Sequence, residues 1–261
     1  MLAALGCVSA AAQSVAYVPT HKSNSVAVVN TATNSVIDVI PVWGFSPLAV
    51  SVINTLTNTV VATIPVGNFP IGVAFTPNGA FAYAVNSNAN SVSVIDTAIR
   101  TVVSTINVGA SPWGVAFTPS RYDESVNPVG LAITPDGAFA YIANYLSNSV
   151  SVISTATNTV VNTIAVGATP ITVAITPNGT SAYVPNDGSN NVSVINTASN
   201  TVTATIAVQA NPRGVAITPD GAFAYVSNRI ANTVSVVNTA TNSVVATVMG
   251  VALFPEAVII R

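Results

Sequence analysis

The chain has 261 residues, of which 50% are hydrophobic and only 5% are charged, and its formal net charge is −2. This length suits a single all-β ring domain, and the scattered lysines and arginines of an acidic chain argue against nucleic acid as a partner. The longest apolar runs are shorter than the 18 or so residues that a membrane span needs, so we expect no transmembrane segment.

The first twelve residues look like the end of a secretory signal peptide. Met1–Ala12 reads MLAALGCVSAAA, which is apolar and ends in a run of alanines typical of a cleavage site. A frayed apolar terminus is the alternative. Cys7, the one cysteine, lies in this segment, so no internal disulfide can form. We expect an exported protein, extracellular, at the cell surface or periplasmic, with one domain over residues 13–261. A surface built mainly from Asn, Ser and Thr is typical of such proteins.

From residue 13 onward the sequence repeats itself. Tyr141, Tyr183 and Tyr225 are spaced 42 residues apart. In the copy at 214–247, four short β-type runs are separated by turns, such as Thr-Pro-Asp-Gly at 218–221, where proline presets φ and glycine accepts a positive φ. The 3.6-residue apolar period of a helix is missing. Because 40–50 residues is the size of one blade, the repeats predict an all-β propeller of four-stranded antiparallel blades.

The copies are not equally complete. Residues 17–47 hold a copy without its first run, and residues 48–70 hold a short copy without the first turn or the tyrosine run. Residues 113–128 are a fragment, while 71–112, 129–170, 171–212 and 213–254 are complete. Signals for a first run occur at Ala49, Val73, Val115, Leu131, Val173, Val215 and Val258. These predict seven blade positions, two of them stunted, with a six-bladed or imperfectly closed ring as the alternative.

The end of the chain matches the run that the first copy lacks. Pro255–Ile260 follows the pattern of Pro212–Ile217. We expect this C-terminal strand to complete the first blade. Such closure would give a monomeric ring and cover two exposed strand edges.

Three tyrosine runs resemble those of a known repeat family. Tyr141-Ile142-Ala143-Asn144, Tyr183-Val184-Pro185-Asn186 and Tyr225-Val226-Ser227-Asn228, each followed by a strand of the Ser-Val-Ser-Val-Ile-Asn-Thr type, are similar to the YVTN β-propeller repeats. The resemblance covers about Ser14 to the C-terminus, and the two stunted copies depart from it. It implies a propeller of the kind found in prokaryotic surface-layer and secreted proteins, related in shape to WD40-like, lactonase-like and quinoprotein-like propellers. It carries no catalytic motif.

The positions that differ between copies indicate where a ligand could bind. They fall in the loop after the tyrosine run and in the loop that joins two blades, and in a four-stranded meander both emerge on one face, the upper face. The post-proline residues should ring the mouth of the central channel. A concave rim with aromatic and polar groups is a common binding surface, and loop decoration without a ligand is the alternative. The candidate binding residues are Trp43, Phe69, Trp113, Tyr145, Arg213, Arg229 and Glu256.

The sequence offers little for catalysis or for metal binding. His21 is the one histidine and lies in a polar loop, and the Gly-x-Ser-x-Gly elbow of a hydrolase is missing. One histidine, with no cysteine after cleavage, cannot form a His/Cys metal cluster. The adjacent carboxylates Asp123 and Glu124 are more typical of a solvated turn than of a calcium site. We expect no catalytic residue, no metal and no cofactor.

The sequence therefore favours a non-enzymatic exported propeller, either a structural surface module or a scaffold that binds a protein or a glycan at its upper face. The alternative is a periplasmic lactonase-like or quinoprotein-like enzyme with its site at the channel mouth. Several ionisable groups converging there, such as Asp38, Asp96, Asp187 and His21, would favour the enzyme.

Overall fold

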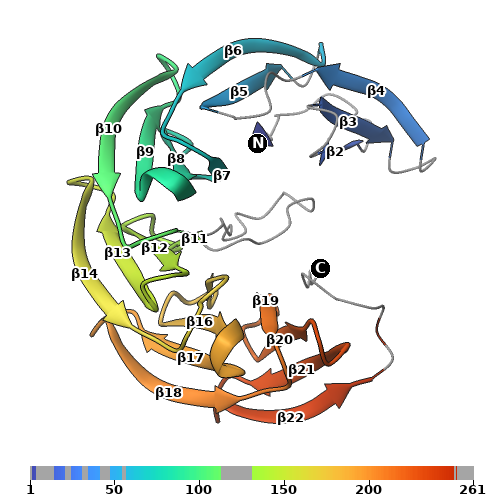
Figure 1. Ribbon diagram of the computed structural model, residues 1–261, viewed down its shortest axis with the longest axis vertical. Coiled ribbons are helices and arrows are strands. Elements are labelled where there is room, and N and C mark those ends of the chain that lie inside the picture. Colours follow the sequence, from blue (N-terminus) through green and yellow to red (C-terminus); the bar gives the residue numbers. More distant parts are fainter. Residues whose placement is uncertain are drawn as a thin grey trace.

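A computed structural model describes residues 2–3, 15–20, 25–30, 35–41, 48–54, 57–112, 131–249 and 251. These residues form six β-sheets that follow one another around an open arc (Figure 1). Within this part of the chain the only helical segments are two 3₁₀ turns, η1 (Ser87–Ala89) and η2 (Asp187–Ser189). The predicted all-β propeller of antiparallel four-stranded sheets is confirmed.

Four sheets are complete. The first consists of β7 (Pro70–Phe75), β8 (Phe81–Asn86), β9 (Ser91–Asp96) and β10 (Thr101–Asn107). The second consists of β11 (Leu131–Ile133), β12 (Phe139–Asn144), β13 (Ser149–Ser154) and β14 (Thr159–Ala165). The third consists of β15 (Ala174–Ile175), β16 (Ser181–Asn186), β17 (Asn191–Asn196) and β18 (Thr201–Ala207). The last consists of β19 (Pro212–Ile217), β20 (Phe223–Asn228), β21 (Thr233–Asn238) and β22 (Ser243–Val248).

Two sheets have three strands each. One consists of β2 (Val15–Thr20), β3 (Ser25–Asn30) and β4 (Ser35–Pro41), and the described residues give it no innermost strand, as predicted for the first copy. The other consists of β1 (Leu2–Ala3), β5 (Ala49–Asn54) and β6 (Thr59–Pro65). β1 pairs with β5 in parallel and falls in the segment expected to be the end of a signal peptide, whose removal stays a prediction.

The assignment of Ala49 to a first strand is wrong. β5 pairs with β6 in the register that β9 uses with β10, so that Asn54 faces Thr59 as Asp96 faces Thr101, and β5 is therefore a third strand. The physical reason is that a first strand needs a turn after it to reverse the chain, and here a single strand continues from Ala49 to Asn54. The signals at Val115 and Val258 lie outside the described residues. Seven blade positions and closure by the C-terminal strand stay predictions.

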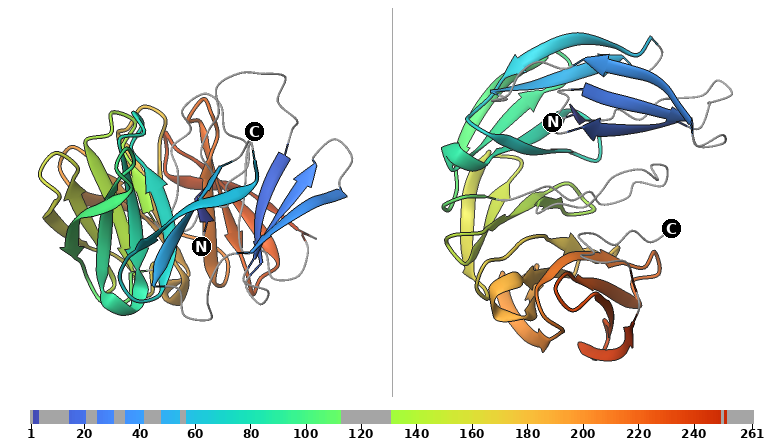
Figure 2. Two further views of the ribbon diagram at one scale, coloured as in Figure 1. Left: turned by 90° about the horizontal axis from the view of Figure 1, so that it is seen from above. Right: turned by 45° about the vertical axis from the view of Figure 1, so that its right-hand side comes forward.

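Within each complete sheet, strands that are neighbours in the sequence pair antiparallel. The first strand therefore lies toward the middle of the arc and the fourth strand on the outside, where β6, β10, β14, β18 and β22 follow one another (Figure 1). Seen from above, the strands run between the two faces of the ring (Figure 2). Loops between second and third strands thus emerge on one face, and the Thr-Pro turns on the other.

The core lies between successive sheets. One cluster joins Tyr83, Val92 and Ile106 of the β7–β10 sheet to Ile142 and Ile153 of the next sheet. Three tyrosines also form hydrogen bonds between neighbouring sheets. The hydroxyl of each donates at 2.7 Å to an asparagine Oδ1 of the following sheet: Tyr83 to Asn158, Tyr141 to Asn200 and Tyr183 to Asn242. Burial raises the pKa of each tyrosine to about 12, so that the hydroxyl stays a donor. We call this contact the tyrosine lock.

Arg100 stands in one turn where the other sheets have the asparagine of the tyrosine lock. Asn158, Asn200 and Asn242 each close a turn between third and fourth strands with a left-handed φ of 54°, 53° and 52°. Arg100 closes the corresponding turn between β9 and β10 with a φ of 55°. The sheet before it, β1-β5-β6, contains no tyrosine strand among its described residues. An asparagine at position 100 would therefore have no tyrosine hydroxyl among the described residues from which to accept a hydrogen bond. Without that role, the turn does not require asparagine at this position.

Every outermost strand contains a β-bulge. The pairing shifts by one residue near the start of each outermost strand. In β14, for example, Val160 faces Ile153 of β13 and Asn162 faces Val152, so that one residue between them has no partner. The extra residue, here Val161, is 52% exposed. A bulge bends the strand and increases its twist. The corresponding extra residues elsewhere are Ile37, Val61, Val103, Thr203 and Val245.

Candidate binding site on the upper face

The two variable loops of each repeat lie side by side on the upper face, as predicted. The backbone N–H that follows each tyrosine strand donates to a carbonyl in the loop that joins the preceding sheet to this one. These hydrogen bonds join Ser87 to Phe69 (2.9 Å), Tyr145 to Ser111 (3.1 Å), Asp187 to Thr169 (3.0 Å) and Arg229 to Asn211 (2.8 Å). The loops of neighbouring sheets therefore form one continuous layer.

A buried asparagine supports each loop from below. Asn144, for example, is 0% exposed, and its Nδ2 donates to Ser149 Oγ at 3.1 Å and to Ser151 Oγ at 2.9 Å. Asn86, Asn186 and Asn228 occupy the same place and bond in the same way. This repeated polar network holds the end of the tyrosine strand against the start of the third strand, and it fixes where each loop begins.

Glycine allows the joining loop to lie directly on that asparagine. A Cβ added at Gly109 would stand 2.8 Å from Cγ of Asn144, and Gly67 and Gly167 approach Asn86 and Asn186 as closely. Real Cβ atoms do not come this near to another side chain, so glycine is needed at these three joints. The upper face thus has a rigid base that is repeated around the arc.

The tips of the loops differ from one another above this base. Leu146 is 66% exposed and Ile230 is 59% exposed, while the same position in the two other loops is Asn88 or Gly188. Phe69, in a joining loop, is 37% exposed and has a φ of 57°. The loop tips therefore differ in polarity from one repeat to the next, although the base below them is the same.

An ion pair links the last two sheets at the upper face. Asp187, at the start of η2, places its Oδ2 3.2 Å from Nε of Arg213, and the Asp187 and Arg213 side chains are 10% and 26% exposed. The side-chain amide of Asn211 also donates to Asp187. The carbonyl of Arg213 in turn accepts from the Thr172 hydroxyl at 2.8 Å. The Arg213 guanidinium therefore lies beside the Asp187 carboxylate, and part of the arginine side chain is open to solvent.

Four of the seven predicted rim residues lie in the described part of the chain. Phe69 and Tyr145 belong to loops of the upper face, Arg229 begins the loop after β20, and Arg213 is the second residue of β19. The ion pair brings Arg213 together with Asp187, which was not among the predicted binding residues. Trp43, Trp113 and Glu256 lie outside the described residues.

Asp96 and Asp187, two of the four residues whose convergence would have favoured an enzyme, lie on opposite faces. Asp187 lies at the upper face, whereas Asp96 ends β9 at the opposite face, where it caps a turn by accepting from the N–H groups of Ala98 and Ile99 at 2.9 and 3.1 Å. Asp38 lies in β4, an outermost strand, and His21 is outside the described residues. Within the described ranges, no group of three or more His, Cys, Asp or Glu side chains could hold a metal ion.

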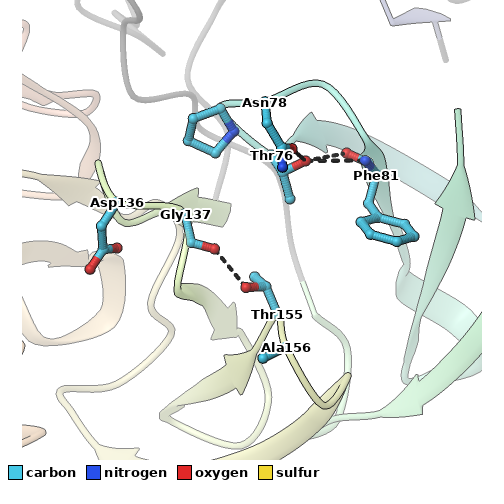
Figure 3. A pocket seen from close by; sticks show the side chains of 8 residues that line it. Thr76, Asn78, Phe81, Asp136, Gly137, Thr155 and Ala156 are labelled. Atoms are coloured by element: carbon cyan, nitrogen blue, oxygen red, sulfur yellow. Dashed lines mark hydrogen bonds between the residues drawn. The ribbon is translucent and has the colours of Figure 1, made fainter.

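The opposite face has a crevice between two sheets, shown in Figure 3. It lies between the turn at 76–81 of one sheet and the turns at 136–137 and 155–156 of the next. Two hydrogen bonds hold its walls in place. Thr155 Oγ1 donates to the Gly137 carbonyl of the neighbouring turn at 2.6 Å, and Thr76 Oγ1 donates to Asn78 Oδ1 within one turn at 2.7 Å. Asp136 occupies the position of Asn78 in the equivalent turn of the next sheet. The hydroxyl of Thr134 and the N–H of Ala138 donate to its carboxylate and lower its pKa. Because the same turns recur in other sheets, the crevice is part of the repeat.

The described residues hold no helix of the length and apolarity that crossing a bilayer requires. No curated protein matches the chain. Among solved structures it is similar to the Kuenenia stuttgartiensis hydrazine synthase, with a TM-score of 0.50 and 20% identity over 92% of this chain and 84% of that chain. A similarity at that identity shows the fold alone.

A family model described as "Lactonase, 7-bladed beta-propeller" matches residues 38–210, which is well over half of the 261 residues. The narrower YVTN surface-layer resemblance stays a prediction. The fold and the match agree, and the chain belongs to the lactonase 7-bladed β-propeller family.

Proposed function

We propose that the protein is an exported, non-enzymatic propeller that binds a protein partner at its upper face. The observation that carries this is the contrast between the base and the tips of the loops. The base is repeated almost unchanged, through the buried asparagines and the loop-to-loop hydrogen bonds. The tips vary, and two of them present exposed aliphatic side chains, Leu146 and Ile230. Rigid scaffolds with variable loops are well suited to recognition.

The chemistry of the tips favours a protein over a glycan. Leu146 and Ile230 give apolar contact, and Arg213 adds a cation whose position is fixed by Asp187. Protein interfaces are enriched in arginine and depleted in lysine, and the six Lys and Arg residues of this chain include five arginines. A glycan would instead be expected to stack on aromatic rings, of which Phe69 and Tyr145 are the described examples.

The test uses substitutions that the repeat itself permits. Leu146→Ser with Ile230→Ser should leave the fold intact, because Asn88 and Gly188 occupy the same position in the neighbouring loops. Val161→Ser, at an exposed apolar site on the outer wall, is the matched control. Immobilised protein is incubated with the secreted and envelope fractions of the source organism, and captured proteins are crosslinked and identified. The double variant should lose a partner that the wild type and Val161→Ser retain. Equal capture by all three would contradict the proposal, and selective binding on a glycan array would indicate the other ligand class.

A lactonase-like hydrolase is the second candidate, and the family match supports it. In that case Arg213 would hold the substrate's carboxylate or carbonyl oxygen, and Asp187, beside it, would be the nearest carboxylate. The test is a panel of γ- and δ-lactones followed by acid release in a pH-stat. Turnover that is lost in Asp187→Asn and in Arg213→Ala, while both variants keep the wild-type melting temperature, would establish the enzyme. Absence of hydrolysis across the panel would leave the binding function as the better account.

A further inference from the structure

One turn occurs four times on the opposite face, in two versions. Each complete sheet joins its first two strands through Thr-Pro-Asx-Gly, with asparagine at positions 78 and 178 and aspartate at positions 136 and 220. The glycine N–H closes each copy by donating to the threonine carbonyl at 2.7–2.8 Å, and the glycine φ lies between 69° and 75°. The main chain of the turn is therefore the same whether its third residue is an amide or an acid.

The side chain of the third residue accepts hydrogen bonds through one oxygen in both versions. Asn78 Oδ1 accepts from the Thr76 hydroxyl at 2.7 Å and from the N–H two residues further on at 3.1 Å. Asp136 Oδ1 accepts from the matching groups, the Thr134 hydroxyl and the N–H two residues further on, at 2.5 and 2.9 Å. Shorter bonds are expected of a charged acceptor. Because these bonds go to an oxygen, a carboxylate serves this turn as well as an amide does.

The asparagine version is the chemically labile one. Because glycine has no Cβ, its main-chain nitrogen can reach the side-chain Cγ of a preceding asparagine with little steric hindrance. The sequence contains two such pairs, Asn78-Gly79 and Asn178-Gly179, and both asparagines are exposed. A Cβ built on Gly79 would meet no atom within 4 Å, so this pair is open to water.

We propose that Asn78 and Asn178 are sites of spontaneous deamidation, which converts their turns to the aspartate version already present at Asp136 and Asp220. The glycine nitrogen attacks Cγ, and the side-chain NH₂ leaves with the proton of that nitrogen as ammonia, so that a succinimide ring forms. Water then breaks the new bond, its OH going to Cγ and its proton to the glycine nitrogen. Each event restores the main chain, leaves an aspartate and lowers the formal net charge of −2 by one unit.

The turn controls both the rate and the product. In the closed turn the attacking nitrogen of Gly79 donates to the Thr76 carbonyl at 2.8 Å, so that the reaction requires this bond to open. Water could also open the ring at the main-chain carbonyl, but the isoaspartate so formed adds an atom to the main chain and no longer fits the turn. A Cβ built on Gly179 would stand 3.3 Å from Cδ of Pro135 in the preceding sheet, so the second pair is more enclosed and should react later.

Isoelectric focusing of the folded protein, stored at mildly alkaline pH, follows the conversion. The wild type should move toward the acidic end in two steps, while Asn78→Asp/Asn178→Asp should start at the final position and stay there. Peptide mass spectrometry should find aspartate at position 78 before position 178. Asn88 is the internal control, since it is exposed but precedes Ala89, and it should remain an amide. Equal acidification of the wild type and the double variant, or none in the wild type, would overturn the proposal.

Thermal unfolding tests whether the turn accepts the product. At neutral pH the melting temperature of Asn78→Asp/Asn178→Asp should lie within about 2 °C of that of freshly purified wild type, as expected for exposed substitutions that keep their hydrogen bonds. A larger fall would show that these turns do not tolerate a carboxylate, and it would overturn the proposal. Isoaspartate as the main product at both positions in the aged, folded protein would overturn it as well.

Discussion

Replacing Asn200 by glycine should weaken the contact between two sheets without straining the backbone. The Oη of buried Tyr141 donates to Asn200 Oδ1 at 2.7 Å, and among the described residues its second acceptor is the more distant Thr197 carbonyl, at 3.3 Å. A hydrogen bond of this kind contributes about 0.5–1.5 kcal/mol net. Because glycine adopts the left-handed φ of 53° freely, the loss should come from the tyrosine lock and not from the turn.

Arg100→Gly is the matched control for this prediction. Arg100 closes the same turn with a φ of 55° but receives no tyrosine from the described part of the preceding sheet. Glycine there removes a left-handed non-glycine residue, which costs about 1 kcal/mol, so Arg100→Gly should be neutral or slightly stabilising. The two variants should therefore differ by about 1–2 kcal/mol, or roughly 2–8 °C in melting temperature.

Thermal unfolding followed by circular dichroism measures this difference, and a double-mutant cycle isolates the tyrosine lock. In a Tyr141→Phe background, Asn200→Gly should cost no more than Arg100→Gly does, since the hydroxyl has already gone. Equal shifts for the two glycine variants in the wild-type background would refute the reasoning, because they would mean that the lock adds nothing to stability.

Three further predictions concern the turns and the two ends of the chain. The Thr134 hydroxyl is the first cause of the lowered pKa of Asp136, and this shift gives stability that is complete above the unfolded pKa of about 3.9 and is lost as pH falls through the folded pKa. Thr134→Val should therefore reduce the dependence of the urea unfolding midpoint on pH over that acidic range, and an unchanged dependence would count against this reasoning. Deleting residues 254–261 should lower the melting temperature measured by calorimetry, and an unchanged value would mean that this segment does not complete the first sheet. N-terminal sequencing of the protein secreted by its source should begin after Ala12, and recovery of a secreted chain that retains Met1 would disprove a cleaved signal peptide.

The sheets were predictable because their signals are local. The turn at 218–221 and its copies specify where a strand reverses, and the polar–apolar alternation of the third run specifies which side of the strand is buried. Ala49 was misassigned for the same reason: where a copy has lost its turn, the local pattern no longer says which strand of the sheet a run belongs to. Pairing with β6, a longer-range property, decides it.

The face of the candidate site was predictable, but its contacts were not. In a four-stranded meander, successive turns emerge on alternate faces of the sheet. Strand order alone therefore places Tyr145 and Arg229 on the same face as Phe69. The ion pair between Asp187 and Arg213 joins different copies, so the repeat period alone does not reveal it. One sequence signal could have found it: both positions differ from their counterparts in the preceding copy, Tyr145 and Ile171, and they change to opposite charges.

The bulges on the outer strands bear on how this protein behaves in different solutions. Among the outer strands, β6, β10, β14, β18 and β22 contain no charged residue and β4 contains only Asp38, although outer strands expose backbone groups that could pair with another molecule. Many proteins keep such strands apart with lysine side chains, whose repulsion weakens when salt is added. Here the bend at Val161 and at its counterparts provides the separation through shape. The outer wall should therefore resist lateral association equally well in fresh water, in brine and in acid.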